Sequence, residues 1–101
     1  MLTATALTAI KNCITNSISY AQYKVGGTYY KANIRSAYIM DDGRVAITFI
    51  IDHSIAGDIT VTEVQLYDHN GSLWASKAES IIRRDVQEGI LYRFAFTITE
   101  S

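Results

Sequence analysis

The fold of this chain is decided by residues 59–77, which read ITVTEVQLYDHNGSLWASK. Apolar and polar residues alternate through most of 59–68, and the pattern resumes at Leu73 after Asn70-Gly71. Such alternation places successive side chains on opposite faces of a strand. Asn-Gly is the strongest short-range hairpin signal, because a tight type I′ turn needs positive φ at both central residues. The stretch therefore predicts an antiparallel β-hairpin with a type I′ turn.

Similar patterns extend along the chain. Further strands are predicted at 18–25, at 28–34 and 37–40 with a bulge or bend at Arg35-Ser36, at 45–51 as a central strand, and at 90–99. Gly26-Gly27 and Asp41-Asp42-Gly43 are turn signals between them. Residues 78–89 contain Arg83-Arg84-Asp85, which is too charged for a central strand, so we expect a long connection or a short irregular strand there.

The last strand predicts one wall of the core. Apolar residues alternate strictly through it, at Ile90, Tyr92, Phe94, Phe96 and Ile98. About seven short strands, with turns between them, are typical of a sandwich or a small barrel. We therefore predict a mainly β chain, with an antiparallel β-sandwich or small barrel formed as a single domain over 1–101.

One helix is predicted before the first strand, over about residues 3–15. Its apolar residues recur at steps of three and four and therefore share one face: Leu2, Ala6, Ala9, Ile10, Cys13 and Ile14. Thr3 or Thr5 is a suitable N-cap, and Asn16-Ser17 is a suitable end. This is an amphipathic N-terminal helix.

Composition narrows the function. The 101 residues carry 9 Lys+Arg and 10 Asp+Glu, a net charge of −1, which gives no field to attract nucleic acid or anionic lipid. The lone Cys13 excludes an internal disulfide and disfavours a thiolate zinc site. We find neither the basic start of a secretory signal nor the roughly 20 apolar residues of a membrane span. We expect no nucleic-acid partner, no membrane partner and folding in the cytoplasm.

Few residues suggest chemistry. Asp41, Asp42 and Asp52 have calcium-binding oxygens but match no calcium loop, and Asp before Gly is ordinary turn chemistry. His53 and His69 lack metal partners at a diagnostic spacing, so we expect surface histidines. A nucleophilic role for Cys13 competes with a small buried hydrophobe on the helix, which we favour. We expect no catalytic, cofactor-binding or metal-binding residue, no cofactor, and no enzyme activity.

Aromatic residues offer a binding surface instead. Tyrosines and a tryptophan recur along the predicted strands, at Tyr20, Tyr23, Tyr29, Tyr30, Tyr38, Tyr67 and Trp74. They fit either a carbohydrate-stacking platform or protein-contact patch, or plain packing on half-buried strand faces. The residues we select as a possible interaction surface are Tyr23, Tyr29, Tyr30 and Trp74. Asn70-Gly71-Ser72 also matches the glycosylation pattern, but a hairpin explains it better, and Arg83-Arg84 is expected to be a solvated loop.

Residues 45–76 carry a family resemblance. VAITFII at 45–51, a short loop, ITVTEVQLYD at 59–68 and then NGSLWA at 70–75 resemble a pattern in tail-fibre and other tail-associated proteins of bacteriophages and phage-like particles. In those proteins a strand ends in Leu-Tyr-Asp. A hairpin turn of any residue, then Asn or Asp, then Gly follows, and the next strand begins with Leu and Ala. Those fibres continue into long repetitive shafts, whereas this sequence stops at Ser101.

The resemblance implies a structural virion protein of a phage tail or tail-like particle, in the tail, baseplate, neck or fibre attachment. Its partners would be other virion structural proteins and further copies of itself in a homo-oligomer, assembled in the bacterial cytoplasm and located in the virion. The alternative is a small carbohydrate- or ligand-binding β-sandwich module.

Overall fold

The computed structural model describes residues 2–52, 55, 57–84 and 89–98. The elements in chain order are helix α1 (Ala4–Ser17) and strands β1 (Ile18–Val25), β2 (Thr28–Ile39), β3 (Val45–Ile51), β4 (Ile59–Asp68), β5 (Leu73–Arg83) and β6 (Ile90–Phe96). The predicted helix and hairpin strands are therefore confirmed.

The strands form one six-stranded antiparallel sheet in the order β5-β4-β1-β2-β3-β6. The long strand β2 belongs to both halves of this sheet. Its first part pairs with β1 over Thr28–Asn33, and its second part pairs with β3 over Ile34–Ile39. The register shifts between Ile34 and Ser36, which is the bulge predicted at Arg35-Ser36, and a bulge bends its strand.

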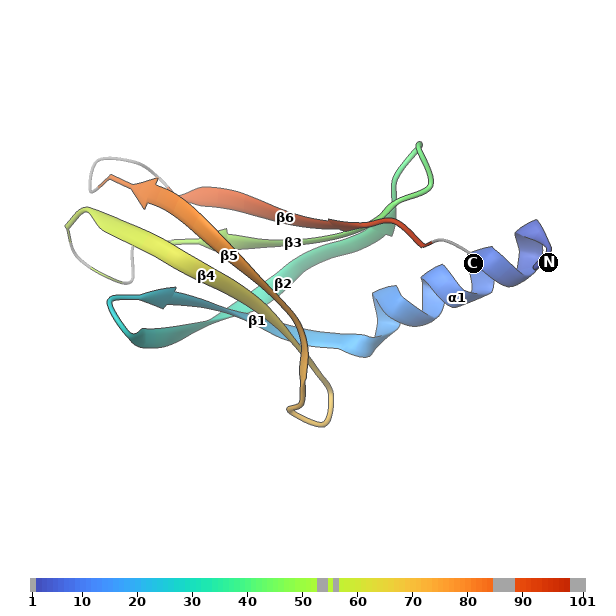
Figure 1. Ribbon diagram of the computed structural model, residues 1–101, viewed down its shortest axis with the longest axis horizontal. Coiled ribbons are helices and arrows are strands. Elements are labelled where there is room, and N and C mark those ends of the chain that lie inside the picture. The colour runs from blue at the N-terminus through green and yellow to red at the C-terminus, as the bar shows by residue number, and fades with distance from the viewer. Residues whose placement is uncertain (1, 53–54, 56, 85–88, 99–101) are drawn as a thin grey trace.

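Because β2 bends, the sheet folds back on itself. Figure 1 shows β1, β4 and β5 lying across from β3 and β6. The result is a nearly barrel-shaped sheet with one N-terminal helix, so the predicted fold class is confirmed. The two edge strands, β5 and β6, border the side that backbone pairing leaves open in the described part of the chain.

The connection predicted at 78–89 is partly wrong. Strand β5 continues as far as Arg83, so the charged run begins inside a strand and not in a loop. The strand accommodates Arg83, although this side chain is buried, because three backbone carbonyls accept hydrogen bonds from its guanidinium. Residues 85–88 lie outside the described residues.

The hairpin turns also differ from the prediction. In the β4–β5 turn, Gly71 has φ 78° and no non-glycine residue in the described chain has positive φ, so Asn70 does not adopt the type I′ conformation. The amide of Gly71 donates to the carbonyl of Asp68 at 3.1 Å, which gives a three-residue loop ending in a left-handed glycine. Positive φ at both central residues occurs instead at Gly26 (58°) and Gly27 (95°), between β1 and β2.

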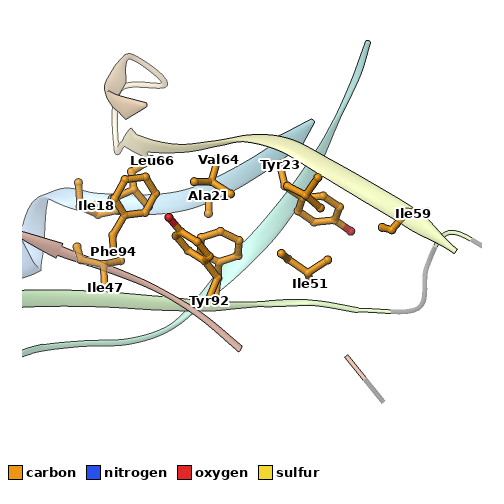
Figure 2. Close-up of a cluster of buried hydrophobic side chains, with 12 residues drawn as sticks. Ile18, Ala21, Tyr23, Ile47, Ile51, Ile59, Val64, Leu66, Tyr92 and Phe94 are labelled. Carbon is orange, nitrogen blue, oxygen red and sulfur yellow. The ribbon is translucent and has the colours of Figure 1, made fainter. Parts of the chain in front are cut away.

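The core lies between the two halves of the sheet. Figure 2 shows Ile18, Ala21 and Tyr23 of β1 with Val64 and Leu66 of β4, facing Ile47, Ile51, Tyr92 and Phe94 from the other half. Full burial of each large apolar side chain stabilises the fold by roughly 1.5–3 kcal/mol. Phe94 and Tyr92 belong to the wall predicted for the last strand.

Helix α1 is different, because none of its residues is buried. Thr3 caps it, accepting a hydrogen bond from the amide of Ala6 at 3.1 Å. It runs without a loop into Ile18, the first residue of β1, and Figure 1 shows it extending away from the sheet. It contacts β1, β2 and β3 only along one side.

Candidate functional site

The four predicted surface aromatics do not form one surface. Tyr23 is only 2% exposed and belongs to the core, and Tyr30 packs against it with ring centroids 5.8 Å apart. Tyr29 is 41% exposed on β2, and Trp74 is 38% exposed on β5. The prediction that Tyr23 lies at the surface is therefore wrong. Alternation separates the faces of a strand but does not tell which face turns inward.

Two aromatic candidates that were not among the four selected, Tyr20 and Tyr67, help to build a polar and aromatic surface on the outer face of β1, β2 and β4. The rings of Tyr20 and Tyr67 stack at 5.0 Å with an interplanar angle of 5°, and Lys31 Nζ lies 4.3 Å from the centroid of Tyr20. Lys31 and Tyr67 therefore both pack on the Tyr20 ring.

Glu63 is the centre of the hydrogen bonds on this outer face. Its carboxylate accepts from the Tyr29 hydroxyl at 3.1 Å, from Gln65 Nε2 at 2.6 Å and from the Ser76 hydroxyl at 3.4 Å. Gln65 Oε1 in turn accepts from the Tyr67 hydroxyl at 2.8 Å. Desolvation, together with the bond to Glu63, raises the pKa of Tyr29. These bonds hold the side chains in fixed positions.

The aromatic rings are engaged within the chain. Lys24 Nζ stands 5.5 Å from the centroid of Tyr29, and Trp74 meets Phe96 edge to face at 5.4 Å. A carbohydrate platform needs flat, open ring faces in one plane. The selected residues do not provide one, since Tyr23 is buried and Tyr29 and Trp74 lie on different strands.

The open side of the sheet is bridged by side chains of the two edge strands. The Tyr92 hydroxyl of β6 donates to Glu79 Oε2 of β5 at 2.5 Å, and the Trp74–Phe96 contact lies further along the same side. Desolvation, followed by the hydrogen bond and charge of Glu79, raises the pKa of Tyr92 well above its ordinary value. Side chains thus cover the core where backbone bonds do not.

The prediction that Arg83 lies in a solvated loop is wrong. Its side chain is 0% exposed, and its guanidinium donates to the carbonyls of Asp52 (2.7 Å), Ile55 (2.7 Å) and Gly57 (2.5 Å). The end of β5 thereby holds the segment that joins β3 to β4. The neighbouring Arg84 is exposed, as predicted.

For the remaining candidate residues, the structure confirms some of the predictions and contradicts others. Asp42 accepts a hydrogen bond from the amide of Arg44 and forms an ion pair with Arg44 Nε at 2.8 Å. The backbone hydrogen bond, followed by the side-chain hydrogen bond, lowers the pKa of Asp42. Asp42 therefore acts as a turn residue, as predicted. His69 is exposed, as predicted, with Nε2 2.9 Å from the carbonyl oxygen of Asn16. Cys13, predicted to be buried, is exposed. His53 lies outside the described residues.

The residues that the structure describes contain no cluster of three or more potential metal ligands, and none of the helices among them is long and apolar enough to cross a membrane.

Large aliphatic side chains are exposed on two parts of the described molecule. One part is the pair of edge strands, where Leu73, Ile82 and Leu91 are 54%, 55% and 58% exposed. The other is the N-terminal segment, where Leu2 and Ile10 are 43% and 40% exposed. An unpaired strand edge can pair with another chain, and the exposed aliphatic side chains of β5, β6 and α1 are apolar surface that a partner would remove from water.

Comparison with models of known protein families found no match, and neither curated proteins nor solved structures gave a significant match.

Proposed function

We propose that this chain is a structural protein of a phage tail or tail-like particle, which acts by protein–protein assembly with other virion proteins and with copies of itself. The observation that carries the proposal is the exposure of Leu73, Ile82 and Leu91 on the two edge strands. The hairpin at 66–71, through which the sequence resembles tail-associated proteins, lies directly before β5.

The physical argument concerns the edges of the sheet. An edge strand presents backbone donors and acceptors that another chain can pair with, and proteins that stay monomeric protect such edges with charge, proline or cover. In this chain both edge strands expose large aliphatic side chains, Leu73 and Ile82 on β5 and Leu91 on β6, alongside the charged Lys77 and Arg93, and the sequence contains no proline. When one edge of each copy meets the other edge of the next, the contacts are head to tail, and they close into a ring if the rotation from copy to copy completes a full turn.

Light scattering across a concentration series tests the assembly. We expect the wild-type chain to give a defined oligomer, and Leu91→Lys to reduce its mass without altering the circular dichroism spectrum. Thr60→Lys is the matched control, because Thr60 is exposed on β4, an inner strand of the sheet. This control variant should retain the wild-type mass.

The virion location needs its own test, in which purified tail particles are analysed by quantitative mass spectrometry. We expect the chain in a fixed ratio to known tail proteins. A monodisperse monomer that binds no co-encoded virion protein would overturn the proposal and favour a small ligand-binding module, which a glycan array would then examine.

A further inference from the structure

Helix α1 shows an apolar side that the described part of its own chain does not cover. Leu7, Lys11 and Ile14 are half-buried on the side that meets β2 and β3. Ala9, Ile10 and Cys13 are exposed, and Ala6, which lies between Ile10 and Cys13 around the helix, is half-buried. The apolar arc of the helix is therefore rotated away from the face that packs on the sheet, which leaves one side of the arc in solvent.

The helix is held in this orientation. No loop separates it from β1, and Ile18, the first residue of β1, is only 7% exposed. His69 lies within hydrogen-bond distance of the Asn16 carbonyl, and Lys11 Nζ is 3.3 Å from the place where a Cβ on Gly43 would stand. These contacts fix the helix at its C-terminal end and near its middle, so the uncovered side is presented in a constant direction.

A helix of this length needs a packing partner. Isolated helices shorter than about 12–15 residues are marginal in water, and most helical stability in proteins comes from packing an apolar face. The helix has 14 residues, and among the described residues the strands β1, β2 and β3 cover only one side of it.

The charge pattern indicates what the partner is. Lys11 is the only charged residue in Ala4–Ser17, and it faces the β2–β3 turn, so the uncovered side carries no charge that would repel an identical surface. The first turn has no acidic residue and the last turn no basic residue, which leaves both ends of the helix dipole without a complementary charge. If a second helix packs against the first in the antiparallel direction, the C-terminus of each helix lies beside the N-terminus of the other, and the opposite partial charges of the two dipoles attract each other.

We propose that the uncovered side of helix α1 pairs with the same helix of a second copy, antiparallel and about a two-fold axis near residues 9 and 10. Ala6 then lies opposite Cys13 of the second copy, and Ala9 lies opposite Ile10 of the second copy. The small side chains of Ala6, Ala9 and Cys13 let the two helices approach closely, and a two-fold contact needs only one self-complementary surface. The pairing rests on the proposed assembly function and specifies one of its contacts.

The size of the contact sets its strength. Stable interfaces bury about 800 Å² on each partner, whereas a helix of this length spans only about 21 Å. The pair is therefore weak and reversible in isolated chains, and covalent trapping is the suitable measurement. Cys13 serves in it only as a reporter.

The experiment is disulfide trapping of the full chain under mild oxidation, read by non-reducing electrophoresis and peptide mass spectrometry. Ala6→Cys, with Cys13 retained, should form a covalent dimer joined between positions 6 and 13. Wild type should form little dimer, because the two Cys13 residues lie about 10 Å apart along the helix axis, beyond the reach of a disulfide. Thr8→Cys, also with Cys13 retained, is the control: Thr8 is exposed, and so no less accessible to oxidation than the half-buried Ala6, but it lies on another side of the helix.

A second variant guards against a folding defect in the first. Ala9→Cys with Cys13→Ser places one cysteine close to the two-fold axis, so it should form a dimer linked at position 9. Several-fold more dimer for both variants than for Thr8→Cys supports the pairing. Equal trapping at all positions would mean random collision and would overturn it, and a dominant wild-type Cys13–Cys13 dimer would indicate parallel helices and overturn the antiparallel arrangement.

The trapping experiment separates this inference from the proposed function. Specific trapping in a chain that is absent from tail particles would keep the helix pairing and remove the virion function. Incorporation into tail particles without specific trapping would keep the virion function and remove the helix pairing.

Discussion

Ile47 in β3 and Ile10 in α1 are the same residue type in opposite surroundings. The first is 0% exposed between the two halves of the sheet, and the second is 40% exposed on a helix that contains no buried residue. Burial in the sheet stabilises the monomer, whereas an apolar side chain left in water gains nothing until another surface covers it. The difference shows that burial in the sheet supplies the core of this chain, whereas the helix keeps apolar side chains exposed.

The largest loss of stability should come from substituting the buried isoleucine of this pair. Ile47→Ala should lower the free energy of unfolding by about 4 kcal/mol, because it removes packed atoms and leaves a cavity. Ile10→Ala should change it by less than about 0.5 kcal/mol. Urea denaturation at low protein concentration measures both. Equal losses would mean that the helix packs into the core of the monomer.

Arg83 tests a polar contribution to the same sheet. Arg83→Met removes three hydrogen bonds and leaves the carbonyls of Asp52, Ile55 and Gly57 without this donor. We expect a loss of about 3 kcal/mol, since each unsatisfied buried group costs about 1–3 kcal/mol and water replaces part of the bonding. Arg84→Met, at the exposed neighbour, is the control in the same denaturation assay and should stay within about 0.5 kcal/mol.

A substitution at Thr3 tests whether the helix unfolds separately from the sheet. Thr3→Ala removes the N-cap acceptor for the amide of Ala6 and should destabilise the helix by about 1 kcal/mol. If the helix stands apart from the sheet, helicity measured by circular dichroism falls while the urea midpoint of the sheet, followed by near-ultraviolet signals, stays unchanged. A shift of that midpoint would show that the two parts unfold together. Thr5→Ala is the control within the first turn.

Much of the sheet was predictable because strand patterns and turn residues are local. Alternation in 59–68 and glycine at position 71 were sufficient to predict the β4–β5 hairpin, although not its turn type. Burial was less predictable. Arg83 is buried because carbonyls from residues some 30 positions earlier in the chain surround its guanidinium, and no local pattern encodes that meeting.

The candidate surfaces show the same limit. Cys13 shares an apolar helix face, and periodicity predicts the face but not whether the chain covers it. The bonds around Glu63 join three strands, so they depend on strand order, which the sequence pattern does not contain.

The smallest effect concerns the open side of the sheet, where Tyr92 and Glu79 provide a side-chain bridge in place of backbone pairing. Tyr92→Phe should cost about 1 kcal/mol at pH 7, the net value of one hydrogen bond. Because desolvation and Glu79 raise the pKa of Tyr92 in the folded state, its stabilising effect is complete below the unfolded pKa of about 10 and declines as the pH rises above it.

The stability difference between wild type and Tyr92→Phe should therefore narrow above about pH 10, by at most about 1.4 kcal/mol per pH unit. Urea midpoints measured from pH 7 to 11 follow this difference. A constant difference would mean that Tyr92 keeps its ordinary pKa and that the bridge to Glu79 contributes no protonation-dependent stability. A narrowing difference would show that a side-chain hydrogen bond between the two edge strands stabilises the open side of the sheet, in contrast to the backbone pairing along β2.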